Sequence, residues 1–495
     1  MATSTQAAAP AAYSGPSGAS IAAILAGLSA VILGAFMSIL DATIVNVALP
    51  TFGRVFQTSL QSLQWIITGY MLASAAVIPL SGWLSDHFGS KRVYLVALVL
   101  FTAGSALCAV ATTAPMLVVF RVLQGLGGGM LMPVGMAILF RVAPHEKRGA
   151  VMGYFGIPML LGPALGPVIS GWLLEVASWP WIFLINLPVG IAAVVIGYRS
   201  LPSLPAEHTD TRLDVPGMLL GPVAFASLVF GISQSTEAGW TGASTLGGIA
   251  VGLVALVAFI ARELAAPNPL IELRVFKSRD FALAIATQWL MVVGLFGTFF
   301  LIPVFLQQVR GYSPFQTGLI SLPNALVAAC TMPIAGRLFD KVGARVPVMI
   351  GLTIVMVSFW MLSHLSAATT VVDLLIPLAV MGGGMGMSMM PLGTHVLNSA
   401  PRNLVSRVTS LTGSCQNVVA SLAIASFATL LQARFVANAA GGPMTVEAQA
   451  TSFGDVYGAA MFVVVAAALM TLSLRRRSSP SGVSEPAREV VSSAV

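Results

Sequence analysis

The sequence has little charge. Only 8% of its 495 residues are Asp, Glu, Lys or Arg, whereas a soluble globular domain carries about 25%. Hydrophobic residues make up 57% of the chain and occur in long runs rather than in alternation with polar residues. A run of about 20 apolar residues can cross a bilayer as a helix, and the alternation typical of a membrane β-barrel strand is missing. The composition therefore predicts an all-α polytopic membrane protein.

Residues that could build a catalytic or metal centre are also scarce. The three cysteines, Cys108, Cys330 and Cys415, lie far apart in separate apolar runs, without metal-ligand spacing or an evident disulfide partner. The five histidines lie in predicted loops or near helix ends, and neither H-E-x-x-H nor G-x-x-x-x-G-K-[ST] occurs. The sequence therefore predicts no metal, no cofactor and no ATP-hydrolysing site, and it disfavours a membrane enzyme or a sensor.

The few charges that are present follow a pattern along the chain. Residues 1–20 are rich in Ala, Ser, Thr and Pro and lack a basic segment, which predicts a disordered tail rather than a cleaved secretory signal. Breaks in hydropathy divide the remainder into fourteen candidate spans. These are 24–49, 62–82, 93–111, 115–139, 149–173, 181–200, 215–234, 244–264, 281–308, 315–337, 346–363, 371–395, 405–431 and 456–474.

The distribution of basic residues supports this count. With the N-terminus in the cytoplasm, 20 of the 24 Lys and Arg residues fall in the connections on that side, as the positive-inside rule requires. The exceptions are Arg54, Arg310 and Arg434 outside and Arg121 within a span. We therefore expect a multi-pass protein of the bacterial cytoplasmic membrane with both termini in the cytoplasm. The net charge of +7 reflects this asymmetry, and no nucleic-acid partner is expected.

An internal repeat divides the chain. "G-W-L-S-D-H-F-G-S-K-R" at 82–92 and "G-R-L-F-D-K-V-G-A-R" at 336–345 share the pattern Gly-x-Leu-x-Asp-x-x-Gly, and two related halves are the plan of many secondary transporters. If each half has six helices, two spans are an inserted pair. The predicted parts are a tail at 1–20, a six-helix bundle at 21–200, the inserted pair with its linkers at 201–266, a second six-helix bundle at 267–476 and a tail at 477–495.

Four motifs resemble those of a known family. "L-D-A-T-I-V-N-V-A-L-P" at 40–50, the loop at 82–92, "R-V-L-Q-G-L-G-G-G" at 121–129 and "G-P-A-L-G-P-V-I-S-G-W" at 162–172 are similar to motifs of the fourteen-helix drug:proton antiporters of the major facilitator superfamily. The resemblance covers nearly the whole chain. The chain departs from the usual pattern at His87, Ser90, Ser170 and Pro180.

The resemblance implies a function. It implies proton-coupled export of lipophilic or amphiphilic drugs and other toxic compounds by alternating access, with the proton gradient as the energy source. Export of one dedicated endogenous molecule, such as an antibiotic, lipid or siderophore, on the same scaffold is the alternative. The expected partners are a small lipophilic substrate, protons and the bilayer, and we expect the chain to act as a monomer.

Asp41 and Arg121 are the only acid and the only base that we place well inside the membrane. Counting along their spans puts them roughly 13 Å and roughly 9 Å from the same face, and intramembrane charges tend to pair or to face a cavity. Burial favours a protonated carboxyl group, whereas a nearby arginine favours the ionised one. The pair is therefore either a static link between two helices or a proton-coupling site, and the resemblance favours the second. Gln124, one turn inward of Arg121, could orient the pair.

Two further motifs suggest moving parts. The span over 153–172 is rich in glycine and proline, and Gly162, Pro163, Gly166 and Pro167 could allow close packing or provide a bend that biases alternating access. The acid of the loop motif could cap a helix or pair with a basic residue and so act as a gate, or the loop could be merely solvated. The candidate gating residues are Gly82, Asp86, Gly89, Lys91 and Arg92, with Asp340 and Arg345 in the second half.

Polar and aromatic side chains within the spans are candidates for a substrate cavity, although such a residue more often forms a hydrogen bond between helices than a contact with a ligand. Because Asp41 is the single acid at depth, we expect a neutral, zwitterionic or monocationic amphiphile rather than a divalent cation. The candidates are Asn46, Gln64, Tyr70, Gln288, Trp289, Asn324, Gln416 and Asn417.

Overall fold

The structure is a computed structural model that describes residues 21–142, 148–202, 213–267, 269–400, 404–439 and 443–474. Its first part comprises α1 (Ile21–Phe56), α2 (Leu60–Phe88), α3 (Ser90–Ala109), α4 (Ala114–Val142), α5 (Arg148–Val176), α6 (Trp181–Leu184) and α7 (Asn186–Ser200). The hairpin α8 (Val215–Ala238) and α9 (Ala243–Ala265) follows. The last part comprises η2 (Leu273–Lys277), α10 (Arg279–Val304), η3 (Phe305–Val309), α11 (Pro314–Val342), α12 (Arg345–Leu362), α13 (Val371–Asn398), α14 (Val405–Asn438) and α15 (Val446–Thr471).

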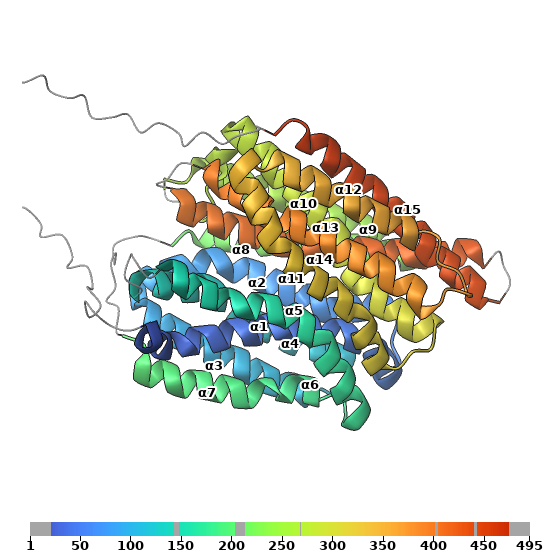
Figure 1. Ribbon diagram of the computed structural model, residues 1–495, viewed down its shortest axis with the longest axis horizontal. Helices are drawn as coiled ribbons and strands as arrows, with labels where there is room; N and C mark the ends of the chain where they lie inside the picture. Colours follow the sequence, from blue (N-terminus) through green and yellow to red (C-terminus); the bar gives the residue numbers. More distant parts are fainter. Residues whose placement is uncertain are drawn as a thin grey trace, which may run out of the picture.

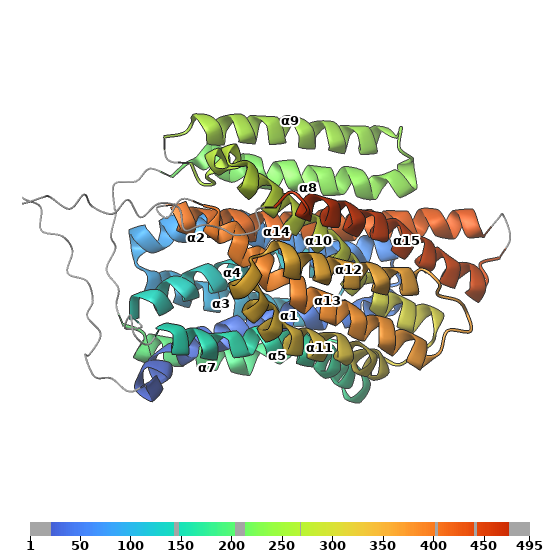
Figure 2. The same ribbon diagram turned by 45° about the horizontal axis from the view of Figure 1, so that its top comes forward.

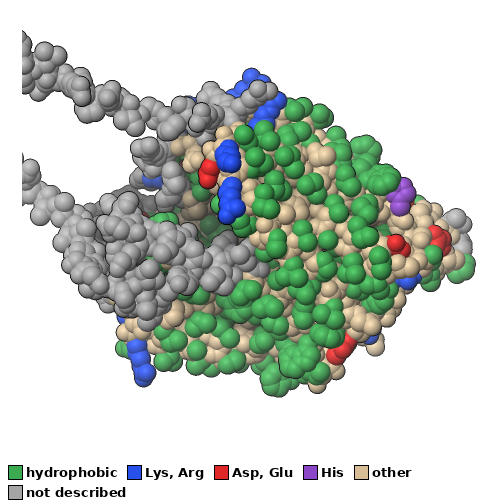
Figure 3. All heavy atoms as spheres, in the orientation of Figure 1, with side chains coloured by type: hydrophobic (Ala, Val, Ile, Leu, Met, Phe, Trp, Pro, Cys, Tyr) green, Lys and Arg blue, Asp and Glu red, His purple; other side chains and the backbone are tan. Residues whose placement is uncertain are grey.

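These helices confirm the predicted all-α polytopic fold. Within the described ranges no strand is present, and 13 helices are long and apolar enough to cross a membrane when α6 and α7 are taken together. Helix α5 is 29 residues long and brings the number to the fourteen predicted. Figure 3 shows hydrophobic side chains across the middle of the visible face and charged ones toward its two ends, as expected for a surface that contacts lipid.

The helices form two groups that meet along two seams. Helices α1 to α7 contact one another, and so do α10 to α15; Figure 1 shows the first group below and the second above. Helix α5 packs on α11 along one seam, and α2 packs on α14 along the other. Any central pathway between the halves is therefore bounded by these two helix pairs.

The hairpin of α8 and α9 lies at the edge of the molecule (Figure 2). Helix α8 contacts both α2 and α14, so the hairpin covers the seam between these two helices. Polar side chains fasten it there: Gln64 Nε2 of α2 donates to Ser233 Oγ of α8 at 2.7 Å, and Thr429 Oγ1 of α14 donates to the carbonyl of Ile232 at 3.3 Å.

The internal repeat has a conformational counterpart. Gly89 separates α2 from α3 with φ 85°, and Gly343 separates α11 from α12 with φ 80°. Residues other than glycine disfavour positive φ angles of this size, so the last glycine of Gly-x-Leu-x-Asp-x-x-Gly is required for the tight turn in each half.

Five predicted helix boundaries were wrong by five residues or more: helices α1, α2, α11 and α14 end five to seven residues later than predicted, and the start of α15 differs most. Helix α15 begins at Val446, ten residues before the predicted start at 456. Thr445 caps it by accepting a hydrogen bond from the Ala448 amide at 3.1 Å. The first ten residues of α15 include several polar ones, so the mean hydropathy there is too low to predict a membrane span. One of them, Asp455, accepts a hydrogen bond of 3.2 Å from Asn438 at the end of α14.

Candidate functional site

Asp41 of α1 and Arg121 of α4 form a buried ion pair. Arg121 Nη1 lies 2.6 Å from Asp41 Oδ2, and each side chain is 1% exposed. Both residues belong to the first half of the molecule. The sequence predicted that they lie at a similar depth in the membrane, and in the structure their side chains are in direct contact. Leaving either charge buried alone would be strongly destabilising, which makes the pair a tightly held unit.

Three polar side chains complete the surroundings of the carboxylate. Gln124 Nε2 donates to Asp41 Oδ1 at 2.9 Å, while its Oε1 accepts from Arg121 Nη1 at 2.6 Å. Asn186 Nδ2 of α7 donates to the same Oδ1 at 3.0 Å, and Ser105 Oγ of α3 accepts from Gln124 at 3.1 Å and from Asn186 at 3.0 Å. All are at least 99% buried, so the network excludes bulk water from the pair.

Asn186 and Ser105 were not among the predicted site residues. Asn186 is the single amide within its span of 181–200, and that isolation is the signal that could have identified it. Ser105 gave no comparable signal, because serine is common within membrane helices and bonds readily to its own backbone.

Arg121 has partners besides Asp41. Its Nε donates to the carbonyl of Ile66 at 3.2 Å, and its guanidinium lies 4.2 Å from the ring centroid of Tyr70 and 5.8 Å from that of Phe183. Aromatic rings stabilise a cation through their faces, more strongly when water is excluded. The arginine is therefore held by a carbonyl, an amide and two rings in addition to the carboxylate.

The glycines after Arg121 explain how α4 comes so close to its neighbours. An added Cβ at Gly127 or Gly129 would approach the backbone of α3 or α2 to about 2.7 Å or less, which no real side chain tolerates. Gly128 faces the Tyr70 ring. Gly104 of α3 likewise lies against the backbone of Gln124. The motif at 121–129 therefore positions the arginine and the glutamine by allowing helix backbones to meet.

A cavity of about 60 Å³ lies between the halves. Thr43 and Asn46 of α1 and Pro163 and Pro167 of α5 contribute to it from the first half, and Asn324 of α11 contributes from the second. We call it the central cavity. Because successive helix residues are rotated by about 100°, Thr43 lies on the side of α1 opposite Asp41. Neither Asp41 nor Arg121 lines this cavity.

The structure brings together only part of the predicted substrate set. Asn46 and Asn324 line the central cavity, whereas Trp289 lines a second, lateral cavity beside α8 and α9. Tyr70 stacks on Arg121, and Gln64 bonds Ser233. The other three, Gln288, Gln416 and Asn417, line neither of these cavities.

The glycines of α5 make close helix contacts at both ends of the motif. An added Cβ at Gly162 or Gly166 would overlap Ile39 or Thr43 of α1. Near the end of α5, Gly171 packs on the backbone of Pro314, and Gly318 of α11 packs on the carbonyl of Pro167. Helix α5 therefore joins α1 to α11, and Pro163 and Pro167 lie where it borders the central cavity.

Ser170, one of the departures from the usual motif, adds a hydrogen bond. Its hydroxyl donates to the carbonyl of Ile44 at 2.8 Å. The hydroxyl thus adds a polar contact between α5 and α1.

The first gating loop makes specific contacts. Arg141 Nη2 of α4 lies 3.7 Å from Asp86 Oδ1, and Lys91 Nζ donates to the carbonyls of Tyr198 at 2.9 Å and Leu201 at 2.6 Å. Lys91 therefore ties the start of α3 to the end of α7. Arg92 is exposed, and a Cβ built at Gly82 would meet no described atom within 4 Å outside its own stretch of helix.

The second gating loop differs from the first. Asp340 is exposed and Arg345 is half-buried, and no ion pair of either residue occurs within the described ranges. The shared element of the two loops is therefore the turn glycine. The part of the chain that the structure describes holds no group of three or more His, Cys, Asp or Glu side chains placed to bind a metal ion.

The pattern of the Major Facilitator Superfamily matches residues 31–424. The chain belongs to this superfamily. Solved structures share the fold at low identity: a D-xylose-proton symporter superposes with a TM-score of 0.66 at 16% identity, over 92% of this chain and 98% of the symporter.

Relatives at higher identity carry names that refer to drugs. A multidrug resistance protein B homolog of Mycobacterium tuberculosis is 39% identical over 82% of this chain and 75% of its own. The multidrug export protein EmrB of Haemophilus influenzae is 32% identical over 77% of this chain and 75% of its own. These relatives confirm the resemblance to multidrug exporters that the motifs indicated.

Proposed function

We propose that this superfamily member exports lipophilic or amphiphilic compounds from the cytoplasm in exchange for protons. The names of its relatives support the drug-like substrate class. The observation that carries the proton-coupling role is the fully buried carboxylate of Asp41, held by Arg121, Gln124 and Asn186. In membrane helices such a buried acid is costly and is typical of proton pathways.

The alternative partners of Arg121 favour a proton site over a static ion pair. When Asp41 takes up a proton, its attraction for the guanidinium falls. Arg121 then keeps the Gln124 side chain, the Ile66 carbonyl and the Tyr70 ring. A buried charge that lost its only partner would be severely destabilising, so this arrangement lets the carboxyl change its charge at tolerable cost.

Helix α1 connects the proton site with the substrate path. Asp41 faces α4 and α7, whereas Thr43 and Asn46 on other faces of the helix line the central cavity. Protonation that loosens the ion pair would let α1 shift relative to α4, and the same shift would reshape the cavity. Movement of α1 thereby links proton binding at Asp41 to substrate binding in the central cavity, although the two ligands do not touch each other.

Both termini are proposed to lie in the cytoplasm. The repeated gating loops then lie on the cytoplasmic side, where the contacts of Asp86 and Lys91 hold neighbouring helix ends together. The close packing of Gly171 on Pro314 lies at the opposite, external end. Alternating access would open these two ends in turn.

The test uses inside-out vesicles that contain the purified protein. Acidifying the lumen should drive accumulation of a fluorescent lipophilic dye, and Asp41→Asn should abolish this accumulation while dye exchange without a pH gradient persists. Asp373→Asn is the matched control, because Asp373 is an exposed carboxylate at the start of α13. Unchanged pH-driven accumulation in Asp41→Asn would contradict the proposed proton site.

A further inference from the structure

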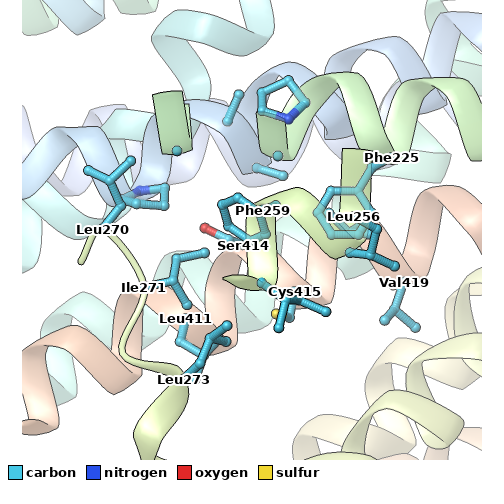
Figure 4. A pocket seen from close by; sticks show the side chains of 18 of the residues that line it. Phe225, Leu256, Phe259, Leu270, Ile271, Leu273, Leu411, Ser414, Cys415 and Val419 are labelled. Carbon is cyan, nitrogen blue, oxygen red and sulfur yellow. The ribbon is translucent and has the colours of Figure 1, made fainter. Parts of the chain in front are cut away.

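A second cavity of about 650 Å³ lies to the side of the central cavity. We call it the lateral cavity. Its walls are α8 and α9 on one side and α2 and α14 on the other, and η2 with Trp289 of α10 closes one end. Figure 4 shows the side chains of these walls around the space, among them Phe225, Phe259, Leu411 and Cys415. This volume is within the range of about 300–1,000 Å³ that is common for small-ligand sites.

The lateral cavity opens onto the lipid-facing surface. Ile260 and Leu264 of α9 line it and remain 40% and 49% exposed. The hairpin that forms this wall lies at the edge of the molecule (Figure 2). A molecule in the surrounding bilayer can therefore enter without passing through the central cavity.

The interior of the lateral cavity is almost entirely apolar, with two unused polar atoms. Ser414 is 4% exposed, and neither its Oγ nor Trp289 Nε1 has a hydrogen-bond partner within the described part of the chain. Buried polar atoms normally have a partner. A ligand with an acceptor between its apolar portion and its head group would supply one.

Positive charge lies at the closed end. Arg274 and Lys277, both on η2, line the cavity and are exposed. Lys277 forms no hydrogen bond or ion pair with any described residue, whereas Arg274 Nη2 donates to the carbonyls of Leu264 and Ala266 at 3.2 Å each. The lysine is therefore available to a ligand, and the arginine is fixed beside it.

The acids near this end each have a partner. Glu272 lies 3.2 Å from Arg407 Nη1 and 4.0 Å from Arg274. Glu263 Oε2 accepts from the Ile271 amide at 2.9 Å, and Asp214 pairs with Arg262 at 3.0 Å. None of these three carboxylates lines the cavity, so Lys277 and Arg274 are the charged residues among its described lining.

We propose that the lateral cavity binds one anionic phospholipid from the adjacent leaflet. An acyl chain occupies the apolar space, the ester oxygens approach Ser414 and Trp289, and the phosphate lies against Lys277 and Arg274. The long apolar volume with a basic end matches a lipid better than a compact solute, because acyl-chain burial and phosphate attraction both contribute. The bound lipid would fill the space between the hairpin and the bundle.

The test measures lipid binding to the full chain in detergent. Phosphatidylglycerol or phosphatidylcholine is added, and native mass spectrometry counts the lipids that the protein retains. Wild type should retain one phosphatidylglycerol in preference to phosphatidylcholine. Lys277→Gln should weaken phosphatidylglycerol binding about five-fold, as expected for one basic group near a phosphate. Gly221→Leu should abolish binding of both lipids, because Gly221 lines the cavity and a Cβ there already lies 3.4 Å from the Phe259 ring, so the rest of the leucine side chain must take up cavity space.

Lys341→Gln is the matched control. Lys341 is an exposed lysine in the last turn of α11, at the same end of the bundle, and it does not line the lateral cavity. It should bind phosphatidylglycerol as wild type does. The thermal unfolding temperature of each variant shows whether it is folded.

A second measurement locates the lipid without any variant. Phosphatidylglycerol with a photoreactive group on its acyl chain should crosslink to peptides of α8, α9 and α14. The proposal is overturned if wild type retains the two lipids equally, if Lys277→Gln and Gly221→Leu both bind as wild type does, or if the crosslinks spread over the lipid-facing surface of all helices. Because binding is measured without transport, loss of the proposed antiport function would leave these outcomes unchanged.

Discussion

The side-chain amide of Asn186 donates a hydrogen bond of 3.0 Å to Oδ1 of Asp41 and so ties α7 to α1 inside the bundle. This bond goes to the oxygen that Arg121 does not contact. An amide N–H can only donate, so the bond fixes Oδ1 from the side of α7. Asn186 therefore holds the carboxylate in position within the site.

Asn186→Ala tests this role. Without the amide, Oδ1 of the carboxylate keeps only the donor from Gln124 among the described residues, so the side chain is less well positioned and pH-driven transport should fall. A hydrogen bond to a charged group contributes about 1.5–3 kcal/mol, so the variant should also unfold at a lower temperature. The measurements are dye accumulation in vesicles with an acidic lumen and thermal unfolding in detergent. Asn417→Ala is the control, because the Asn417 side chain bonds, among the described residues, only the Gly413 carbonyl of its own helix; equal accumulation and equal stability for both variants would exclude the role.

The buried ion pair predicts strong coupling between its members. Arg121→Gln leaves the Asp41 carboxylate without a cation and should lower the free energy of unfolding by about 3–5 kcal/mol. Adding Asp41→Asn removes the unpaired charge and should restore most of that stability without restoring pH-driven transport. Thermal unfolding in detergent measures the first effect, and vesicle transport measures the second. A double variant no more stable than Arg121→Gln would show that the carboxylate is not the source of the instability.

The partly exposed pair of Arg141 and Asp86 is the comparison. Its nitrogen–oxygen distance is 3.7 Å, and its side chains are 27% and 43% exposed. Because surface pairs contribute only about 0–1 kcal/mol, Arg141→Gln should change stability little.

Gly166 limits the distance between α5 and α1. Gly166→Ala places a methyl group in the position of the Thr43 side chain, and overpacking of this kind typically costs about 1–3 kcal/mol. Gly393→Ala is the matched substitution on α13, where no atom lies within 4 Å of the added Cβ, and it should be neutral or stabilising because glycine weakens a helix. Gly166→Ala should therefore unfold at a lower temperature than Gly393→Ala. Equal stabilities would mean that the contact of α5 with α1 is easily relaxed.

Lys91 and its neighbour Arg92 should differ in importance. Lys91 Nζ donates to two carbonyls at the end of α7, whereas Arg92 is exposed. Lys91→Ala should lower stability by about 1 kcal/mol after allowance for solvent screening, and it should increase proteolysis of the loop after α7. Arg92→Ala should remain within about 0.5 kcal/mol of wild type. Limited proteolysis of both variants is the measurement. Faster cleavage of Arg92→Ala than of Lys91→Ala would contradict the prediction.

The sequence was sufficient for the main pair but not for its surroundings. Asp41 and Arg121 could be matched because each is a lone charge whose depth follows from counting residues along a span. Gln124 followed from its position one turn from the arginine. Asn186 could not be assigned to the same site, because its contact depends on the rotation of α7 about its own axis, which residue counting does not determine.

The cavities were less predictable than the ion pair. Tyr70 and Trp289 were predicted to share one substrate cavity, yet Tyr70 covers Arg121 and Trp289 faces the hairpin of α8 and α9. Both residues are aromatic groups within spans, so their sequence context is similar. Only the packing of helices far apart in the chain separates them, and the same packing creates the lateral cavity, whose walls come from α2, α8, α9 and α14.

The hairpin makes the two seams between the halves unequal. The α2–α14 seam is covered by α8, whereas the helices of the α5–α11 seam present exposed leucines to the bilayer, among them Leu165 and Leu319. When one half rocks against the other, lipid must rearrange along the α5–α11 seam, but along the α2–α14 seam a helix of the same chain must slide. Membrane composition should therefore influence the motion at the α5–α11 seam, and the length of the hairpin's connections should influence it at the α2–α14 seam.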